Sequence, residues 1–137
     1  MIVVDASMAL RWVLAEEIDA EVIAARTYVS EHGACVPGNF QTEVVHGLLQ
    51  AERRKRISSS DASAALTDIM DFALTVELPD PHLITITARD HSLTGYDAAY
   101  LALALQSGIP LATVDGTLRA AARAAKVLWQ PRRQKRS

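Results

Sequence analysis

The sequence predicts a three-layer α/β/α fold with a mostly parallel central sheet. Short apolar, β-branched runs alternate along the chain with longer segments that have helical periodicity. The first run, MIVVD (1–5), passes directly into a helical segment, ASMALRWVLAEE (6–17). A length of 137 residues, half of them hydrophobic, fits one core of this kind. Such a βα order covers both faces of a parallel sheet with helices.

The next elements follow from caps and stop signals. DAEVIAARTYVSEHG (19–33) is predicted to be a helix that Gly33 ends, and ACVP (34–37) a short strand. GNFQTEVVHGLLQAERRKR (38–56) is a helix with Asn39 as a plausible N-cap. SSSDASAALTDIMDFA (58–73) is predicted to form a further helix, which begins within its serine run.

The second half of the chain continues the alternation. TVELP (75–79) and PLATVD (110–115) are predicted strands, and 115–126 is a helix that leads to the apolar residues 127–129. HLITITARDH (82–91) alternates Ile and Thr like a strand. Its position in a crossover between strands favours a short helix instead.

Composition narrows the class of protein. A net charge of −2 and a pI near 6.1 give no overall basic field, so nucleic acid would have to bind through local patches or cations. With Cys35 alone, the chain has neither an internal disulfide nor a cysteine zinc cluster. The sequence contains no signal-peptide pattern or apolar run long enough to span a membrane, so we expect a cytoplasmic protein without a membrane partner.

Four acidic residues are predicted to meet at one edge of the sheet. Asp5 and Asp115 end strands, Glu43 lies in the first turns of a helix, and Asp97 begins another. Helix N-termini and the carboxyl ends of strands share one rim in a parallel α/β sheet, and ligands bind there. The sequence therefore predicts an acidic site at this rim.

Each acid also has a structural alternative. Asp5 and Asp115 could cap the helices that follow them, Thr94 and Asp97 fit a capping box, and Glu43 could be a solvated helix residue. Taken alone, each acid fits capping better than function. Two carboxylates about 4 Å apart, however, repel by roughly 4 kcal/mol at an effective dielectric of 20. Four acids at one rim therefore indicate a cation between them.

The donor type indicates which cation. Carboxylate oxygens without a required His or Cys suit Mg²⁺ or Mn²⁺, which can activate water and bind a phosphodiester. The histidines lack metal-ligand spacing. The sequence also lacks the phosphate-binding, dinucleotide-binding and serine-hydrolase motifs G-x-x-x-x-G-K-[ST], G-x-G-x-x-G and G-x-S-x-G.

Four blocks of sequence, in order, resemble a known family. VVDASM (3–8), TEVVHGLL (42–49), YDAAYLALA (96–104) and PLATVD (110–115) resemble the PIN-domain ribonucleases, specifically VapC-type toxins of toxin–antitoxin pairs. The resemblance covers nearly the whole chain, and its most specific part is YDAAYLALA followed by T-x-D. It implies a PIN-like nuclease domain over 1–130, followed by a basic tail at 131–137.

The resemblance also implies an activity and its residues. It implies an Mg²⁺- or Mn²⁺-dependent endoribonuclease whose acidic quartet falls on the four acids above, with supporting hydroxyls on Ser7 and Thr113. Metal-activated water would cleave RNA to leave a 3′-hydroxyl and a 5′-phosphate. Two positions depart from the family pattern: His46 stands where many members have Asn, and Gly116 where many have Lys or Arg.

Predicted partners are an RNA substrate, a VapB-type antitoxin and a second copy in a homodimer. Candidate RNA contacts are Arg11 and the basic run Arg53, Arg54, Lys55 and Arg56, although that run also fits a solvated helix end. By resemblance, helices of the N-terminal half form a groove for the antitoxin. Trp12 and Leu48 fit that groove or the core.

Two other classes of protein stay open on the sequence alone. A phosphate-accepting signalling domain also gathers acids around Mg²⁺, but the first strand ends in a single acid and 75–79 ends without an Asp. A non-catalytic binding module would use the acids only as helix caps. Within the nuclease class, the nearest variant is an enzyme that acts on DNA.

Overall fold

The computed structural model describes residues 1–14 and 19–132. Its four strands form one parallel sheet in the order β3-β2-β1-β4. Val3 of β1 pairs with Cys35 of β2 on one side and with Leu111 of β4 on the other. The predicted parallel α/β fold is confirmed. The strands are β1 (Ile2–Val4), β2 (Ala34–Val36), β3 (Leu74–Val76) and β4 (Leu111–Ala112).

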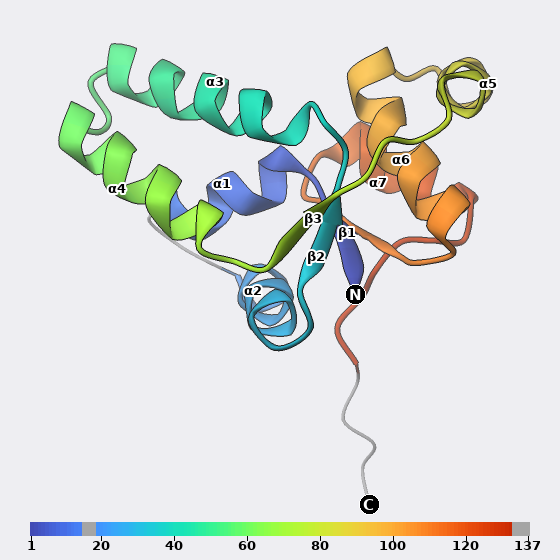
Figure 1. Cartoon of the computed structure of the whole chain (residues 1–137), viewed down its shortest axis with the longest axis horizontal. Coiled ribbons are helices and arrows are strands. Elements are labelled where there is room, and N and C mark those ends of the chain that lie inside the picture. The colour runs from blue at the N-terminus through green and yellow to red at the C-terminus, as the bar shows by residue number, and fades with distance from the viewer. Residues whose placement is uncertain (15–18, 133–137) are drawn as a thin grey trace, which may run out of the picture.

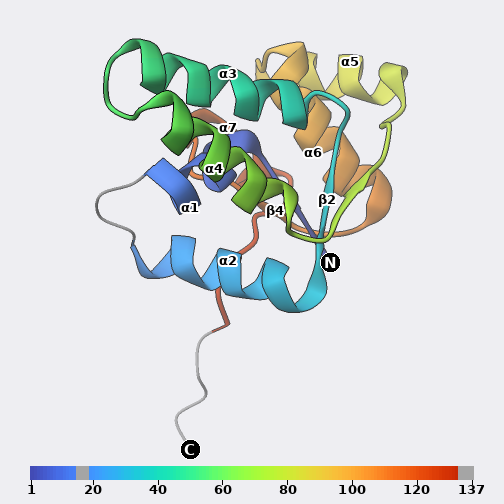
Figure 2. The same cartoon turned by 60° about the vertical axis from the view of Figure 1, so that its left-hand side comes forward.

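Helices cover both faces of the sheet. In Figure 1, α1 to α4 gather on one side of the strands and α5 to α7 on the other, as expected of three layers. Figure 2 shows α3 and α4 next to each other, with α2 apart from them. The bounds are α1 (Ala6–Leu14), α2 (Ala20–His32), α3 (Phe40–Arg53), α4 (Ser59–Met70), α5 (Pro81–His91), α6 (Gly95–Ser107) and α7 (Gly116–Ala124).

Local sequence explains where the helices begin and end. Gly33 ends α2 with a φ of 76°, a conformation that glycine adopts without strain. Ser58 and Asp61 form the capping box that starts α4. Segment 82–91 is helical, as favoured above, because Asp80 caps α5 and Pro81 occupies its first turn. Asn39 lies at the N-cap of α3, but its side chain does not cap the helix.

Several predicted bounds shift. The predicted strand 110–115 is shorter in the structure, where β4 is Leu111–Ala112. Residues 113–115 lie beyond the hydrogen bonds of the sheet, so their polar side chains do not interrupt it. The apolar residues 127–129 contribute a parallel bridge between Leu128 and Leu111. The predicted end of the first helix, 15–17, lies outside the described residues, as does the tail from 133 onward.

Apolar side chains from both helical layers form the core. Trp12 packs against Phe72 with ring centroids 5.0 Å apart, and Leu48 is buried, so both belong to the core. Cys35 is a buried free thiol in β2. An added Cβ on Gly47 would collide with Leu10, so glycine there lets α3 approach α1 closely. Within the described part of the chain, no helix is long and apolar enough to cross a membrane.

Candidate active site

The four predicted acids come from four elements that reach the same rim. Asp5 follows β1, Asp115 follows the short coil after β4, and Glu43 and Asp97 lie in the first turns of α3 and α6. The carboxyl ends of parallel strands and the N-termini of crossover helices share this edge. Figure 1 shows α3 and α6 beginning above the sheet at this edge.

Asp5 is the most enclosed of the four acids. Its carboxylate is 4% exposed and accepts hydrogen bonds from the Met8 amide at 3.0 Å and the Thr113 hydroxyl at 2.6 Å. The Ser7 hydroxyl lies 2.8 and 2.9 Å from its two oxygens and donates to them. Burial, with a smaller contribution from nearby Asp115, raises the pKa of Asp5 to about 6 despite these donors. Asp5 is therefore held by neutral groups in a site that disfavours its charge.

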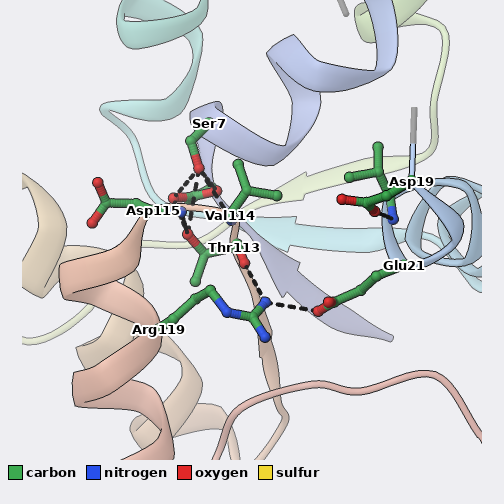
Figure 3. Close-up of polar contacts among 9 residues, drawn as sticks. Ser7, Asp19, Glu21, Thr113, Val114, Asp115 and Arg119 are labelled. Atoms are coloured by element: carbon green, nitrogen blue, oxygen red, sulfur yellow. Dashed lines mark hydrogen bonds and ion pairs between the residues drawn. The ribbon is translucent and has the colours of Figure 1, made fainter. Parts of the chain in front are cut away.

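Thr113 joins the two strand-end acids. Its hydroxyl donates to Asp5 and accepts a hydrogen bond from the Asp115 amide at 3.1 Å. Its carbonyl oxygen, beyond the end of β4, accepts from Arg119 Nη1 at 3.0 Å. The same Nη1 lies 2.7 Å from Glu21 Oε1, so Arg119 links the coil to the first turn of α2 (Figure 3). Arg119 therefore fixes the position of Thr113 without touching the acids.

Asp115 and Asp97 both take part in helix caps. The Asp115 carboxylate accepts from the Leu118 amide at 2.9 Å and caps α7, and Figure 3 shows it pointing away from Ser7 and Thr113. Thr94 caps α6 by accepting from the Asp97 amide at 3.1 Å. The predicted cap by Asp115 is present, whereas the hydrogen bonds of the α6 cap include the Asp97 amide and not its carboxylate.

In the described residues, the Glu43 carboxylate accepts hydrogen bonds at only one of its two oxygens. The Tyr100 hydroxyl donates to Glu43 Oε2 at 2.7 Å, and the Asn39 side-chain amide donates to the same oxygen. Burial, and then the hydrogen bond to Glu43, raise the pKa of Tyr100 well above its usual value, so this hydroxyl stays protonated and donates.

The carboxylates at the rim repel one another electrostatically. Burial comes first in raising the pKa of Asp97, followed by the negative charges of Asp115 and Glu43. Asp115 likewise contributes to the raised pKa of Asp5. The ion pairs of the described residues, His32 with Glu31 and Arg119 with Glu21, leave all four acids without a cationic side chain.

The donor set fits a hard divalent cation. Anionic oxygens that repel one another and have no cationic partner are the ligands that Mg²⁺ and Mn²⁺ prefer. In residues 1–14 and 19–132, no three acidic, His or Cys side chains are already close enough to hold an ion. The four acids therefore share the rim without already forming a ligand cluster.

The predicted basic run lies apart from the acids. The basic run, residues 53–56, is exposed and sits about 15 Å along the α3 axis from Glu43, at a rise of about 1.5 Å per residue. Figure 1 shows α3 leading away from the sheet toward that end. Arg11 is exposed on α1. The structure therefore brings the four acids together but not the basic run.

Three polar residues make contacts at the site that the sequence did not predict. Tyr100 is a buried core residue, but its hydroxyl also donates to Glu43, and it lies one helical turn after Asp97. Asn39 was taken as a cap, although it precedes Glu43 by one turn, and Arg119 follows Asp115 by one turn. An interval of three or four residues from each acid is the signal that could have found them.

Comparison with known proteins identifies the family. The sequence pattern of the PIN domain matches residues 2–124. The chain belongs to the PIN-domain family. Two curated relatives from Mycobacterium tuberculosis are similar to this PIN-domain protein. Ribonuclease VapC1 is 36% identical over 104 residues, which are 74% of this chain and 77% of the relative, and ribonuclease VapC12 is 34% identical over 122 residues, 86% and 89%.

Solved structures show the same PIN fold. The crystal structure of PAE2754 from Pyrobaculum aerophilum matches with a TM-score of 0.68 at 25% identity, covering 88% of this chain and 83% of that one. Mycobacterium tuberculosis VapC20, described as a toxin that cleaves the sarcin–ricin loop, matches with a TM-score of 0.60 at 19% identity, covering 88% and 95%. VapC20 therefore bears on the fold of this chain alone. PIN nucleases related to VapC are typically metal-dependent.

Proposed function

We propose that this PIN-domain protein is a metal-dependent endoribonuclease toxin that hydrolyses RNA phosphodiester bonds. The observation that carries the proposal is that Asp5, Glu43, Asp97 and Asp115 share one rim where none of them forms an ion pair with a cationic side chain of the described residues. Membership of the PIN family and similarity to ribonucleases VapC1 and VapC12 support the same activity. The phosphate-accepting signalling domain gains no support from this family.

Each side chain has a role in this mechanism. The four acids would hold Mg²⁺ or Mn²⁺, which when bound supplies an activated water and offsets the charge of the scissile phosphate. Ser7 and Thr113 fix Asp5 through its two oxygens. Asp115 and Asp97 stay attached to the starts of α7 and α6. Water attack on the phosphorus leaves a 3′-hydroxyl and a 5′-phosphate, and it does not require the RNA 2′-hydroxyl.

Basic side chains outside this acidic rim would bind the phosphates of the RNA. Arg11 and the basic run 53–56 are exposed and are our candidates for phosphate contacts. The basic tail, residues 131–137, is a further candidate for non-specific attraction to RNA.

An antitoxin of the VapB type and a second copy of the chain are the proposed protein partners. Between α3 and α4, Val45, Leu48, Leu49, Ala62 and Leu66 line a shallow apolar groove that fits an amphipathic antitoxin segment. An antitoxin arginine that enters the acidic rim would compete with the cation and inhibit cleavage.

Cleavage assays with isosteric variants test the activity. Purified protein should cut labelled RNA in Mn²⁺ and stop in excess EDTA. Asp97→Asn should lower the rate at least about 100-fold, because loss of a ligand costs more than the 10–100-fold typical of an outer-shell partner. Asp68→Asn, an exposed acid near the end of α4, where the chain leads into the start of β3 at the opposite edge of the sheet, is the matched control and should cleave normally.

Two results would contradict the proposal. RNA cleavage at the wild-type rate in EDTA or by Asp97→Asn would exclude the metal mechanism. Faster cleavage of single-stranded DNA than of RNA would assign the site to DNA. In cells, sequencing of RNA 5′ ends after induction of wild type and Asp97→Asn should give new ends with the wild type alone, and those ends identify the target.

A further inference from the structure

Glu43 differs from Asp5 in having hydrogen-bond donors on only one of its oxygens. In the described residues, every hydrogen bond donated to its carboxylate goes to Oε2, from the Tyr100 hydroxyl and the Asn39 amide. Oε1 therefore keeps its lone pairs for another ligand. A carboxylate with one oxygen occupied and one free is suited to bind a cation through a single oxygen.

Asn39 connects the starts of α3 and α6. Its amide nitrogen donates to Glu43 Oε2 and lies 3.4 Å from the backbone oxygen of Tyr96, the residue before Asp97. Both neighbours are acceptors, so the nitrogen of the Asn39 amide, rather than its oxygen, must face them. Asn39 thereby couples the position of Glu43 to the turn that carries Asp97.

Tyr100 is the second donor to Glu43 Oε2. It lies one turn after Asp97 on α6, and its side chain is only 1% exposed, so packing fixes the direction of its hydroxyl. Asn39 from α3 and Tyr100 from α6 together hold Glu43 beside Asp97.

The neutrality of both donors matters chemically. Glu43 and Asp97 repel each other, and without a restraint Glu43 could rotate toward solvent. Lys or Arg in place of these donors would hold Glu43, but it would also supply the positive charge that the acids otherwise draw from a metal. A hydroxyl and an amide hold the carboxylate and leave its negative charge for the cation.

We propose that Asn39 and Tyr100 are positioning residues that hold Glu43 by Oε2, so that Oε1 is presented to the cation as a single-oxygen ligand. This inference rests on the proposed metal-dependent function and names how one of its ligands is set. Neither residue touches the substrate or the cation. Both act through Glu43.

Calorimetric titration with Mn²⁺ in the absence of RNA tests this arrangement. Tyr100→Phe removes one buried hydroxyl and should weaken Mn²⁺ binding about 10-fold, the lower end of the range for outer-shell partners. Asn39→Ala should weaken it by a similar or smaller factor. Tyr96→Phe makes the same chemical change on an exposed tyrosine of the same helix and should alter affinity less than twofold.

A second background separates positioning from packing. In Glu43→Ala protein, Tyr100→Phe should change Mn²⁺ affinity less than twofold, because the residue through which it acts is gone. Melting temperatures in EDTA monitor the fold of every variant. If Tyr100→Phe misfolds, Asn39→Ala, at a half-exposed position, reports on the same arrangement.

The outcomes distinguish this inference from the proposed function. Wild-type Mn²⁺ affinity in both Tyr100→Phe and Asn39→Ala, with weakened binding in Glu43→Ala, overturns the positioning role alone. An equal effect of Tyr100→Phe in both backgrounds also overturns it. Failure of the wild-type protein to bind Mn²⁺ overturns the metal-dependent function and this inference with it.

Discussion

Asp5 and Glu43 lie at the same rim and carry the same charge, yet the fold holds them differently. Asp5 is buried, and donors from α1 and from the coil after β4 occupy both of its oxygens. Glu43 is half-buried, and its two donors share one oxygen. The strand side of the site is therefore enclosed, whereas the helix side keeps a free oxygen.

This difference indicates that the two acids contribute differently to stability and to metal binding. Burying a carboxylate such as Asp5 costs free energy, and its neutral donors offset only part of that cost. The stability of the charged form of Asp5 is therefore sensitive to protons and cations. Glu43 meets less desolvation and depends more on its two donors for orientation. We expect changes on the strand side to alter both stability and cleavage, and changes on the helix side to alter metal binding with little effect on stability.

Among changes that leave all four acids in place, the largest effect is expected from Thr113→Val, which removes the hydroxyl between Asp5 and Asp115 at nearly constant volume. Asp5 loses a donor and the partly buried Asp115 amide loses its acceptor. Cleavage should fall about 10–100-fold and the free energy of unfolding by about 1–3 kcal/mol. Urea denaturation and RNA cleavage measure the two effects. Thr67→Val on exposed α4 is the control, and equal behaviour of the two variants would contradict the enclosed role of Thr113.

The pH dependence of stability probes Asp5 directly. Its pKa is about 6 in the fold and 3.8 without it, so between these values the folded state binds more protons than the unfolded state. In EDTA, the free energy of unfolding should therefore fall by about 2 kcal/mol as the pH rises from about 4 to 6. Asp5→Asn should flatten this dependence, and Asp68→Asn, on the exposed surface of α4, should keep it. Equal slopes for the wild type and Asp5→Asn over this interval would refute the raised pKa.

Arg119→Ala should have a smaller effect on the strand side. It removes a partly exposed ion pair with Glu21 and one hydrogen bond to the Thr113 carbonyl. We expect a loss of about 1 kcal/mol in the free energy of unfolding and a modest loss of cleavage. Arg123→Ala, on exposed α7 surface, is the matched control. Equal melting temperatures for the two variants would show that the contacts of Arg119 with Glu21 and Thr113 do not stabilise the fold.

The smallest effect is expected outside both sides of the site. Replacing the basic run 53–56 by glutamines should raise KM for RNA roughly threefold, leave kcat unchanged and flatten the salt dependence of binding. The physical reason is that phosphate contacts far from the acids add affinity but not chemistry. Steady-state kinetics at two salt concentrations measure this effect. An unchanged KM and salt slope would assign the run to a solvated helix end.

Much of the fold and the positions of the acids could be predicted from the sequence. Apolar, β-branched strands and capped helices alternate regularly, and this order places Asp5, Glu43, Asp97 and Asp115 at one rim through the rules for parallel sheets. The capping signals at Ser58 and Gly33 are equally local.

The hydrogen-bond partners of the acids were decided by tertiary structure. Tyr100 and Glu43 are 57 residues apart, as Thr113 and Asp5 are 108 apart, and no local pattern indicates which donor meets which oxygen. The sequence by itself determined the elements and the rim, because periodicity and caps act over a few residues. Only the packing of α6 beside α3 decided that Tyr100 joins Asn39 on one oxygen of Glu43, and only the return of the chain after β4 brought Thr113 to Asp5. The physical reason is that burial and the direction of these donors depend on side chains distant in the chain.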